Sequence, residues 1–293
     1  MRILLTGATG FLGRSLVKAL LSKGVHVTAL TRPGSNLRRL EAFLGSINVL
    51  KVSGEGGFAV PDRQFDAVIH TAVSYGRNGE NWAHICDANV TYPLRILQGA
   101  MQSGTGTFIN IGTSLSGDVS PYALSKTQFS NWGRTFCRIG STSFRFVNAR
   151  PEQFYGPGDD QSKFVTWLIK QCIINAPRIP LTSGKQVRDF IHIDDVISAI
   201  TCLTEAAVTE NIPAGYSEFD VGSGTPITVR SFAELVSRMT ASTSILDFDA
   251  VPYRDHEYME SRPKLEPLRQ LGWSCKMSLE EGLLNVIQSE RNQ

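Results

Sequence analysis

Short apolar runs alternate with longer amphipathic segments through the first half of the chain. Five runs have the length and composition of buried strands, at residues 3–6, 25–30, 67–70, 107–111 and 143–148. Apolar residues recur at helical spacing over residues 11–23, and residues 89–102 and 121–139 also have a helical pattern. Strand–helix alternation of this kind predicts parallel strands joined by right-handed crossovers. We therefore expect an α/β fold with a Rossmann-like doubly wound parallel sheet.

The second half of the chain has a less regular pattern. Helices are predicted over residues 232–239 and 279–287, and glycine- and proline-rich turns interrupt the rest, most clearly at residues 155–159. We place a boundary at residue 150. It divides a sheet domain (1–150) from a smaller C-terminal α/β domain (151–293) whose segments partly interleave with the first.

Composition narrows the class of protein. The chain has 293 residues, 42% hydrophobic and 19% charged, and a net charge of +2, which is ordinary for a globular protein and gives no bulk attraction for nucleic acid. No apolar run approaches the roughly 18 residues that span a bilayer. The five cysteines are scattered and the histidines lack metal-ligand spacing. We expect a cytoplasmic protein without a metal site.

A glycine-rich segment follows the first predicted strand directly and opens the first helix. Its spacing is GxxGxxG, and the residues predicted to bind there are Gly7, Thr9, Gly10, Phe11, Leu12 and Gly13. Glycine lets the backbone turn sharply and approach a pyrophosphate, and the helix N-terminus offers free N–H groups. The position between a strand and a helix predicts a dinucleotide-binding loop.

The end of the second predicted strand indicates which dinucleotide is bound. Rossmann domains that choose NAD usually carry Asp or Glu there, to hold the ribose 2′-hydroxyl. This strand instead ends in Thr31-Arg32, and an arginine can pair with a 2′-phosphate. We predict NADP(H) with Arg32 as the selecting residue, and NAD(H) stays open as the alternative.

A tyrosine and a lysine stand four residues apart on a predicted helix. Tyr122 and Lys126 therefore share one helix face, where the ammonium is expected to lower the pKa of the phenol. Tyr122 can then protonate a carbonyl oxygen as a hydride reaches its carbon. Thr113 follows the strand at residues 107–111, where a hydroxyl can bond the reacting oxygen, and Ser114 is the close competitor.

These motifs, in this order, resemble the extended short-chain dehydrogenase/reductases, which include nucleotide-sugar epimerases, dehydratases and reductases. The resemblance covers almost the whole chain. It also includes the segments at residues 66–72, 150–159, 188–196, 220–224 and 271–273. Within the family the chain is most similar to the 4-ketoreductases that make 6-deoxy and 3,6-dideoxy sugars, partly because the gap between Thr113 and Tyr122 is short.

The resemblance implies roles for further residues. Thr71, Ala72 and Asn89 are expected to line the cofactor, and Lys126 to hold the nicotinamide ribose. Gln153 stands where the family usually has an asparagine beside the substrate diphosphate, and Arg188 and Arg254 stand where it has arginines that grip this group. Residues 51–55 have no match to the aspartate that often contacts adenine in the family. A homodimer through the helices at residues 89–102 and 121–139 is also implied. Independently of the resemblance, we expect Tyr75 to line the sugar pocket.

The neighbours of Thr113 discriminate among the reactions of the family. Dehydration needs carboxylates beside this hydroxyl. By the resemblance, reductases of the GDP-fucose synthase kind carry a Cys–His pair near this point. Here the sequence continues Ser114-Leu115-Ser116, with neither acid nor cysteine. This leaves reduction of a C4 ketone on a nucleotide-linked sugar, favoured by Arg32, with 4-epimerisation as the alternative. A non-catalytic NADP-binding regulator is disfavoured because both Tyr122 and Lys126 are present.

Overall fold

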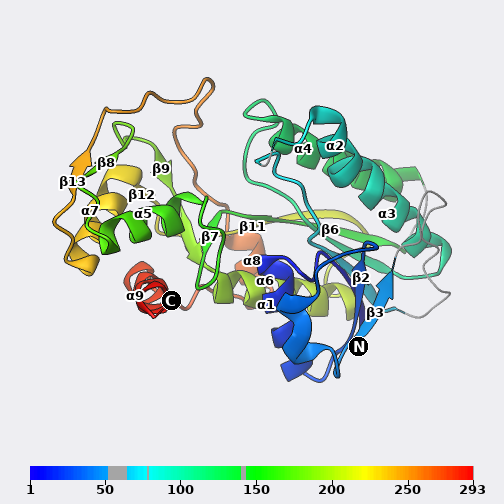
Figure 1. Cartoon of the computed structure of the whole chain (residues 1–293). Helices are drawn as coiled ribbons and strands as arrows, with labels where there is room; N and C mark the ends of the chain where they lie inside the picture. Colours follow the sequence, from blue (N-terminus) through cyan, green and yellow to red (C-terminus); the bar gives the residue numbers. More distant parts are fainter. Residues whose placement is uncertain (52–64, 78, 140–142, 293) are drawn as a thin grey trace.

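The computed structural model describes residues 1–51, 65–77, 79–139 and 143–292. Its centre is a sheet of seven parallel strands in the order β11-β6-β5-β4-β1-β2-β3 (Figure 1). This confirms the predicted fold class. The strands are β1 (Arg2–Thr6), β2 (His26–Thr31), β3 (Asn48–Lys51), β4 (Ala67–His70), β5 (Thr107–Ile111), β6 (Arg145–Pro151) and β11 (Gly215–Val221).

Helices cover both faces of the sheet because its strands are apolar on both sides. On one face lie α1 (Phe11–Ser22) and α6 (Ile193–Val208), packed over alternate strand residues such as Leu5. On the other lie α3 (Tyr92–Gln102) and α4 (Pro121–Ile139), packed over the intervening residues such as Leu4 (Figure 1). The short 3-10 helix η1 (Arg38–Phe43) lies beside α1.

The helix expected at residues 89–102 begins earlier than the pattern predicts. Helical structure starts at α2 (Trp82–Cys86), passes through the wider π-turn η2 (Asp87–Thr91) and continues as α3. Pro93 lies in the first turn of α3 and has no N–H, so the α-helical bond to the carbonyl of residue 89 cannot form. The wider turn places Asn89 in the protein interior.

The central sheet also takes material from beyond residue 150. Strand β11 pairs with β6 along its whole length, and α6 packs against β5 and β6. Both elements belong to the half of the chain that has the less regular pattern. The division into 1–150 and 151–293 stays a prediction.

The remaining elements form a second lobe beside the sheet (Figure 1). Its core includes Phe190 and Phe232, whose ring centroids lie 3.9 Å apart. The helices are α5 (Phe164–Ile173), α7 (Val229–Thr240) and α9 (Leu279–Arg291), and α8 (Glu266–Gln270) packs against β11. Three small sheets pair β7 (Gln153–Tyr155) with β10 (Phe190–His192), β9 (Val187–Arg188) with β12 (Ile227–Thr228), and β8 (Arg178–Pro180) with β13 (Ile245–Asp247). Within the described residues, no helix is both long and apolar enough to cross a membrane.

Two buried aspartates join the sheet to this lobe. Asp189 accepts hydrogen bonds from the backbone N–H groups of Ser223, at 2.7 Å, and Gly224, at 2.8 Å. Asp195 accepts from the N–H groups of Lys276, at 3.0 Å, and Met277, at 2.9 Å. Asp189 and Asp195 of the 188–196 segment are therefore structural. They fix the loop after β11 and the turn before α9.

Helix α4 packs so closely on β6 that only glycine fits at one contact. A Cβ atom on Gly133 would lie about 2.5 Å from Cε1 and Cε2 of Phe146. We predict that Gly133→Ala lowers the free energy of unfolding by about 1–3 kcal/mol, because the fully buried Phe146 ring must move. Urea denaturation measures the change. Gly106→Ala, where a Cβ would meet nothing within 4 Å, is the matched control, and equal stability of the two variants would contradict the packing argument.

Candidate active site

The glycine-rich loop fits tightly between the ends of β1 and β4. Gly7 has a φ of +71°, and a Cβ there would lie 2.5 Å from the backbone nitrogen of Ala72. A Cβ on Gly13 would overlap the carbonyl oxygen of Gly7. Thr71 donates a 2.7 Å hydrogen bond to the carbonyl oxygen of Thr6. The predicted residues of this loop and of the 71–72 turn thus lie together at one edge of the sheet.

Helix α1 begins at Phe11, and its N-cap residue Gly10 makes no side-chain capping bond. The first turn carries no acidic residue that would repel a phosphate. A helix N-terminus of this kind attracts anions through its free N–H groups and its dipole. The crowded glycines and the uncapped N-terminus together fit the pyrophosphate of a dinucleotide. Arg32 is exposed at the end of β2, beyond the same edge of the sheet. Residues 52–55, which have no match to the family's adenine-contacting aspartate, lie outside the described residues.

Asn89 is almost fully buried and bonds to two other segments. Its Nδ2 donates to the carbonyl oxygen of Ser74 and to Oγ of Ser125, at 2.8 and 2.9 Å. Its Oδ1 accepts a 2.8 Å hydrogen bond from the backbone nitrogen of Ser74. The side chain therefore ties the segment after β4 to α4. Its expected contact with the cofactor stays a prediction.

The predicted acid–base residues meet at the carboxyl end of β5. Thr113 follows this strand, and its hydroxyl accepts a 3.2 Å hydrogen bond from the backbone nitrogen of Leu115. The same hydroxyl is hydrogen-bonded to the phenol of Tyr122, from the first turn of α4. Thr113 and Tyr122 are thus in direct contact, as a shared bond to one carbonyl oxygen requires.

The pKa of Tyr122 is shifted in the opposite direction to the one expected from the sequence. Burial raises the pKa of this phenol, the ring of Tyr75 4.9 Å away raises it further, and the bond to Thr113 only partly offsets the effect. We expected Lys126 to lower it, but the loss of solvation is the largest effect, and Lys126 is not among the groups that shift this pKa. Tyr122 therefore retains its proton at neutral pH, which is the state needed to donate it.

Lys126 lies one turn further along α4 and is 3% exposed. Burial lowers the pKa of its ammonium to about 8. His70, at the end of β4, is fully buried and hydrogen-bonded to Thr6 at 2.7 Å. Burial, and secondarily the charge of Lys126, lower the pKa of His70, so this imidazole is neutral at neutral pH. His70 adds no second positive charge beside Lys126.

Tyr75 also lies at this edge, beside residues that sequence reasoning did not identify. Lys163 pairs with Asp159 at 2.9 Å, and its Nζ lies 5.9 Å from the ring centroid of Tyr75 and 5.4 Å from that of Phe11. Lys163 thus connects the glycine-rich loop to the predicted sugar-pocket residue. A lysine four residues after an aspartate at the start of a helix is a common surface pattern, so the sequence gave no distinguishing signal.

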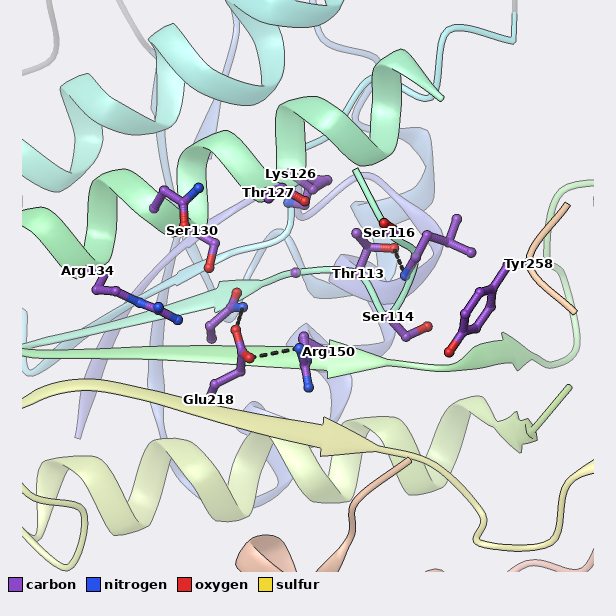
Figure 2. Close-up of a pocket in the computed structure, with 14 residues that line it drawn as sticks. Thr113, Ser114, Ser116, Lys126, Thr127, Ser130, Arg134, Arg150, Glu218 and Tyr258 are labelled. Carbon is purple, nitrogen blue, oxygen red and sulfur yellow. Dashed lines mark hydrogen bonds and ion pairs between the residues drawn. The ribbon is translucent and has the colours of Figure 1, made fainter. Parts of the chain in front are cut away.

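A cavity of about 290 Å³ begins beside Thr113 and Lys126 and extends along α4 (Figure 2). Ser114 and Tyr258 lie at one end, and Ser130 and Arg134 at the other. Its floor is polar because Asn148 donates to Glu218 at 2.9 Å, and Glu218 pairs with Arg150 at 2.8 Å. Gly112 gives Asn148 room to approach, since a Cβ there would lie 2.6 Å from its Oδ1. The sequence did not predict this network, which joins β6 to β11.

The three residues expected beside a substrate diphosphate lie in different surroundings. Arg188 is 8% exposed and pairs with Glu257 at 2.5 Å. Gln153 is exposed at the start of β7, and Arg254 is exposed in the segment between β13 and α8. Their roles stay predictions. Among the described residues, no group of three or more His, Cys, Asp and Glu side chains is arranged to hold a metal ion.

A doubly wound sheet with a dinucleotide-type loop and a Thr–Tyr–Lys group at its carboxyl edge defines a Rossmann-type protein of the short-chain dehydrogenase class. The profile of the NAD dependent epimerase/dehydratase family matches residues 3–217. The chain belongs to this family.

Proteins of known name support the assignment over the full length. The chain is 29% identical over 297 residues to the CDP-abequose synthase of Salmonella typhimurium strain LT2, covering 97% of each chain. It is 30% identical to the CDP-abequose synthase of Salmonella muenchen, covering 98% of this chain and 97% of the relative. The fold also matches a Thermotoga maritima UDP-glucose 4-epimerase in complex with UDP-glucose, with a TM-score of 0.84, 22% identity and coverage of 100% and 99%.

Burial of Lys126 predicts a pH-dependent cost to stability. Its pKa falls from 10.5 to about 8, so the folded state holds fewer protons than the unfolded state between these values, and wild-type stability rises across this window. Lys126→Met removes the buried charge. At pH 7 the variant should be more stable than wild type by up to about 3 kcal/mol.

Urea denaturation from about pH 7 to about pH 10 tests this expectation, because the advantage of Lys126→Met should shrink as pH rises. Lys18→Met, at an exposed lysine on α1, is the matched control and should show no such trend. A difference between Lys126→Met and wild type that stays constant with pH would contradict the assignment of a lowered pKa.

Proposed function

We propose that this protein is an enzyme that reduces the C4 ketone of a nucleotide-linked 6-deoxy or 3,6-dideoxy sugar with NADPH. The observation that carries the proposal is the contact between Thr113 and Tyr122 one turn from the buried Lys126, at the edge where the glycine-rich loop lies. The similarity to CDP-abequose synthases over 97% of the chain favours a sugar nucleotide as substrate. A 4-epimerase is the alternative.

The chain's own residues account for the proton and for binding. Tyr122 retains its proton because burial raises its pKa, so it can donate this proton to the carbonyl oxygen. Thr113 bonds the same oxygen and holds the phenol toward it. Lys126, with a pKa of about 8, is largely charged at pH 7 and stabilises negative charge as the proton leaves Tyr122. A bound nicotinamide supplies the hydride.

The dinucleotide and the sugar nucleotide would both bind at the carboxyl edge of the sheet. Gly7, Thr9, Gly10, Phe11, Leu12 and Gly13, with Thr71 and Ala72, would hold the dinucleotide. The substrate would lie over Tyr75 and Thr113, with its diphosphate toward Gln153, Arg188 and Arg254. Arg188 reaches a phosphate only when its bond to Glu257 opens or is shared, and bidentate arginine–phosphate contacts are strong enough to compete.

The homodimer is part of the same proposal. Helix α4 exposes Leu124, Trp132 and Ile139, which is apolar surface of the kind that a partner subunit covers. A cytoplasmic location likewise stays a prediction.

Removal of one hydroxyl tests the reaction. Tyr122→Phe should lower kcat by about a hundredfold or more, because it removes the phenolic proton that is donated to the carbonyl oxygen, while NADPH still binds. Loss of NADPH absorbance with a panel of 4-keto-6-deoxy sugar nucleotides measures turnover, and NMR of the product identifies reduction or epimerisation. Tyr155→Phe, which loses a 3.3 Å bond to the carbonyl oxygen of Leu279 in the second lobe, is the control. Near-normal turnover by Tyr122→Phe would refute the assignment.

Substitution of Arg32 tests the choice of cofactor. Arg32→Ala should weaken NADPH binding by about tenfold to a hundredfold and leave NADH binding nearly unchanged, because only NADPH has the 2′-phosphate. Fluorescence titration of both dinucleotides measures the ratio of their Kd values. Arg178→Ala, on the second lobe, should leave both unchanged. Equal weakening of both dinucleotides by Arg32→Ala would argue against 2′-phosphate recognition.

A further inference from the structure

Glu152 is a buried carboxyl group at this site, and the sequence patterns did not identify it. It lies between β6 and β7 and is 6% exposed. Its backbone nitrogen donates to the carbonyl oxygen of Val221 at 2.9 Å. Its carboxyl accepts a hydrogen bond from the hydroxyl of Ser261 and is also hydrogen-bonded to Ser114. The group therefore connects the segment before α8 to the turn that carries Thr113.

The charges around Glu152 leave it without a dedicated cation. Asp189 and Asp220 face it from the ends of β9 and β11, and both oppose its ionisation. Arg188 is the neighbouring cation, but its guanidinium is already bonded to Glu257. Burial is the largest effect and raises the pKa of Glu152 to about 7. Both protonation states are therefore populated near neutral pH.

Ser114 connects this carboxyl group to the cavity. It lines the cavity beside Thr113 and faces Tyr258 (Figure 2). A hydroxyl has one proton, so it donates in one direction only. An ionised Glu152 can only accept, and Ser114 then donates its proton away from the cavity. A protonated Glu152 can instead donate to Ser114, whose own O–H is then free to point into the cavity.

We propose that Ser114 is a second hydrogen-bond donor to the carbonyl oxygen of the substrate, and that Glu152 is the positioning residue that sets the direction of this donor. The inference rests on the proposed function. The proton of Glu152 stays between Glu152 and Ser114, and the proton transferred to product still comes from Tyr122. Because the donor is available only when Glu152 is protonated, its contribution is present at low pH and is lost as pH rises through about 7.

The variant Glu152→Gln separates this role from a structural one. The amide oxygen of glutamine can accept from Ser261 while its NH₂ group donates to Ser114, so the arrangement of the protonated carboxyl is kept without titration. Ser114→Ala removes the donor itself. Glu205→Gln is the matched control, because Glu205 lies on α6 and forms a half-exposed ion pair with Lys23.

The experiment measures kcat and KM for NADPH-dependent reduction across about two pH units on either side of 7, with thermal unfolding of each variant as a check on folding. Wild type and Glu205→Gln should lose about tenfold or more in kcat above pH 7. Glu152→Gln should keep the low-pH rate through the step near pH 7 and lose activity only as Lys126 loses its charge near pH 8. Ser114→Ala should show the reduced rate at every pH.

Two outcomes would overturn the inference while leaving the proposed function intact. These are a Glu152→Gln profile that falls near pH 7 as that of wild type does, before the step of Lys126 near pH 8, and full activity in Ser114→Ala at low pH. Failure of wild type to reduce any 4-keto sugar nucleotide would instead overturn the proposed function. Infrared difference spectra of wild type against Glu152→Gln report the carboxylic acid band without substrate, and a band that does not titrate near pH 7 would exclude Glu152 as the switch.

Discussion

The parallel alignment of β1, β4, β5 and β6 is the constraint on which the rest of the structure depends. Because these strands run in one direction, the segments that follow them meet at a single edge of the sheet. Gly7, Thr71, Thr113 and Glu152 each stand within two residues of the end of one of these strands. The close approach holds only where side chains are missing, as at Gly7 against Ala72 and at Gly112 against Asn148.

Four ionisable groups lie at this edge, three of them buried and Tyr122 half-buried, and loss of solvation shifts each pKa toward the neutral form of the group. The pKa values of His70 and Lys126 are lowered, and those of Tyr122 and Glu152 are raised. Burial of such groups costs stability, so their concentration at one place is typical of a functional site rather than of a structural core. The site is thereby suited to donate protons near neutral pH. A solvated glutamate would be ionised near neutral pH and would have no proton to donate.

Sequence patterns predicted what depends on local order. The glycine-rich loop, strands β1, β2, β4, β5 and β6, and the pairing of Tyr122 with Lys126 on one helix all follow from spacing along the chain, whereas the short edge strand β3 was missed. Strand β11 was missed because its partner β6 lies 70 residues earlier, and nothing in its own composition indicates that partner. The pKa shift of Tyr122 had the wrong sign in the prediction, because spacing indicates a neighbouring charge but not the loss of solvation around it.

Glu152 shows the same limit most clearly. Its neighbours Ser114, Asp220 and Ser261 come from three separate parts of the chain, and no pattern joins them. No acid follows Thr113 directly, so the sequence analysis predicted no carboxyl group at the site. The fold nevertheless brings one there, Glu152, from the position after β6.

The segment between β13 and α8 contacts several charged and polar groups of the site. It carries Glu257, which holds Arg188, together with Tyr258 at the cavity mouth and Ser261 against Glu152. Because the fold is common to proteins named as epimerases and dehydratases, the fold alone does not select the reaction. Contacts from a segment with little regular structure can change without disturbing the sheet. The sheet therefore fixes where the hydroxyls and the glycine-rich loop meet, whereas this segment supplies contacts to the charged and polar groups around them.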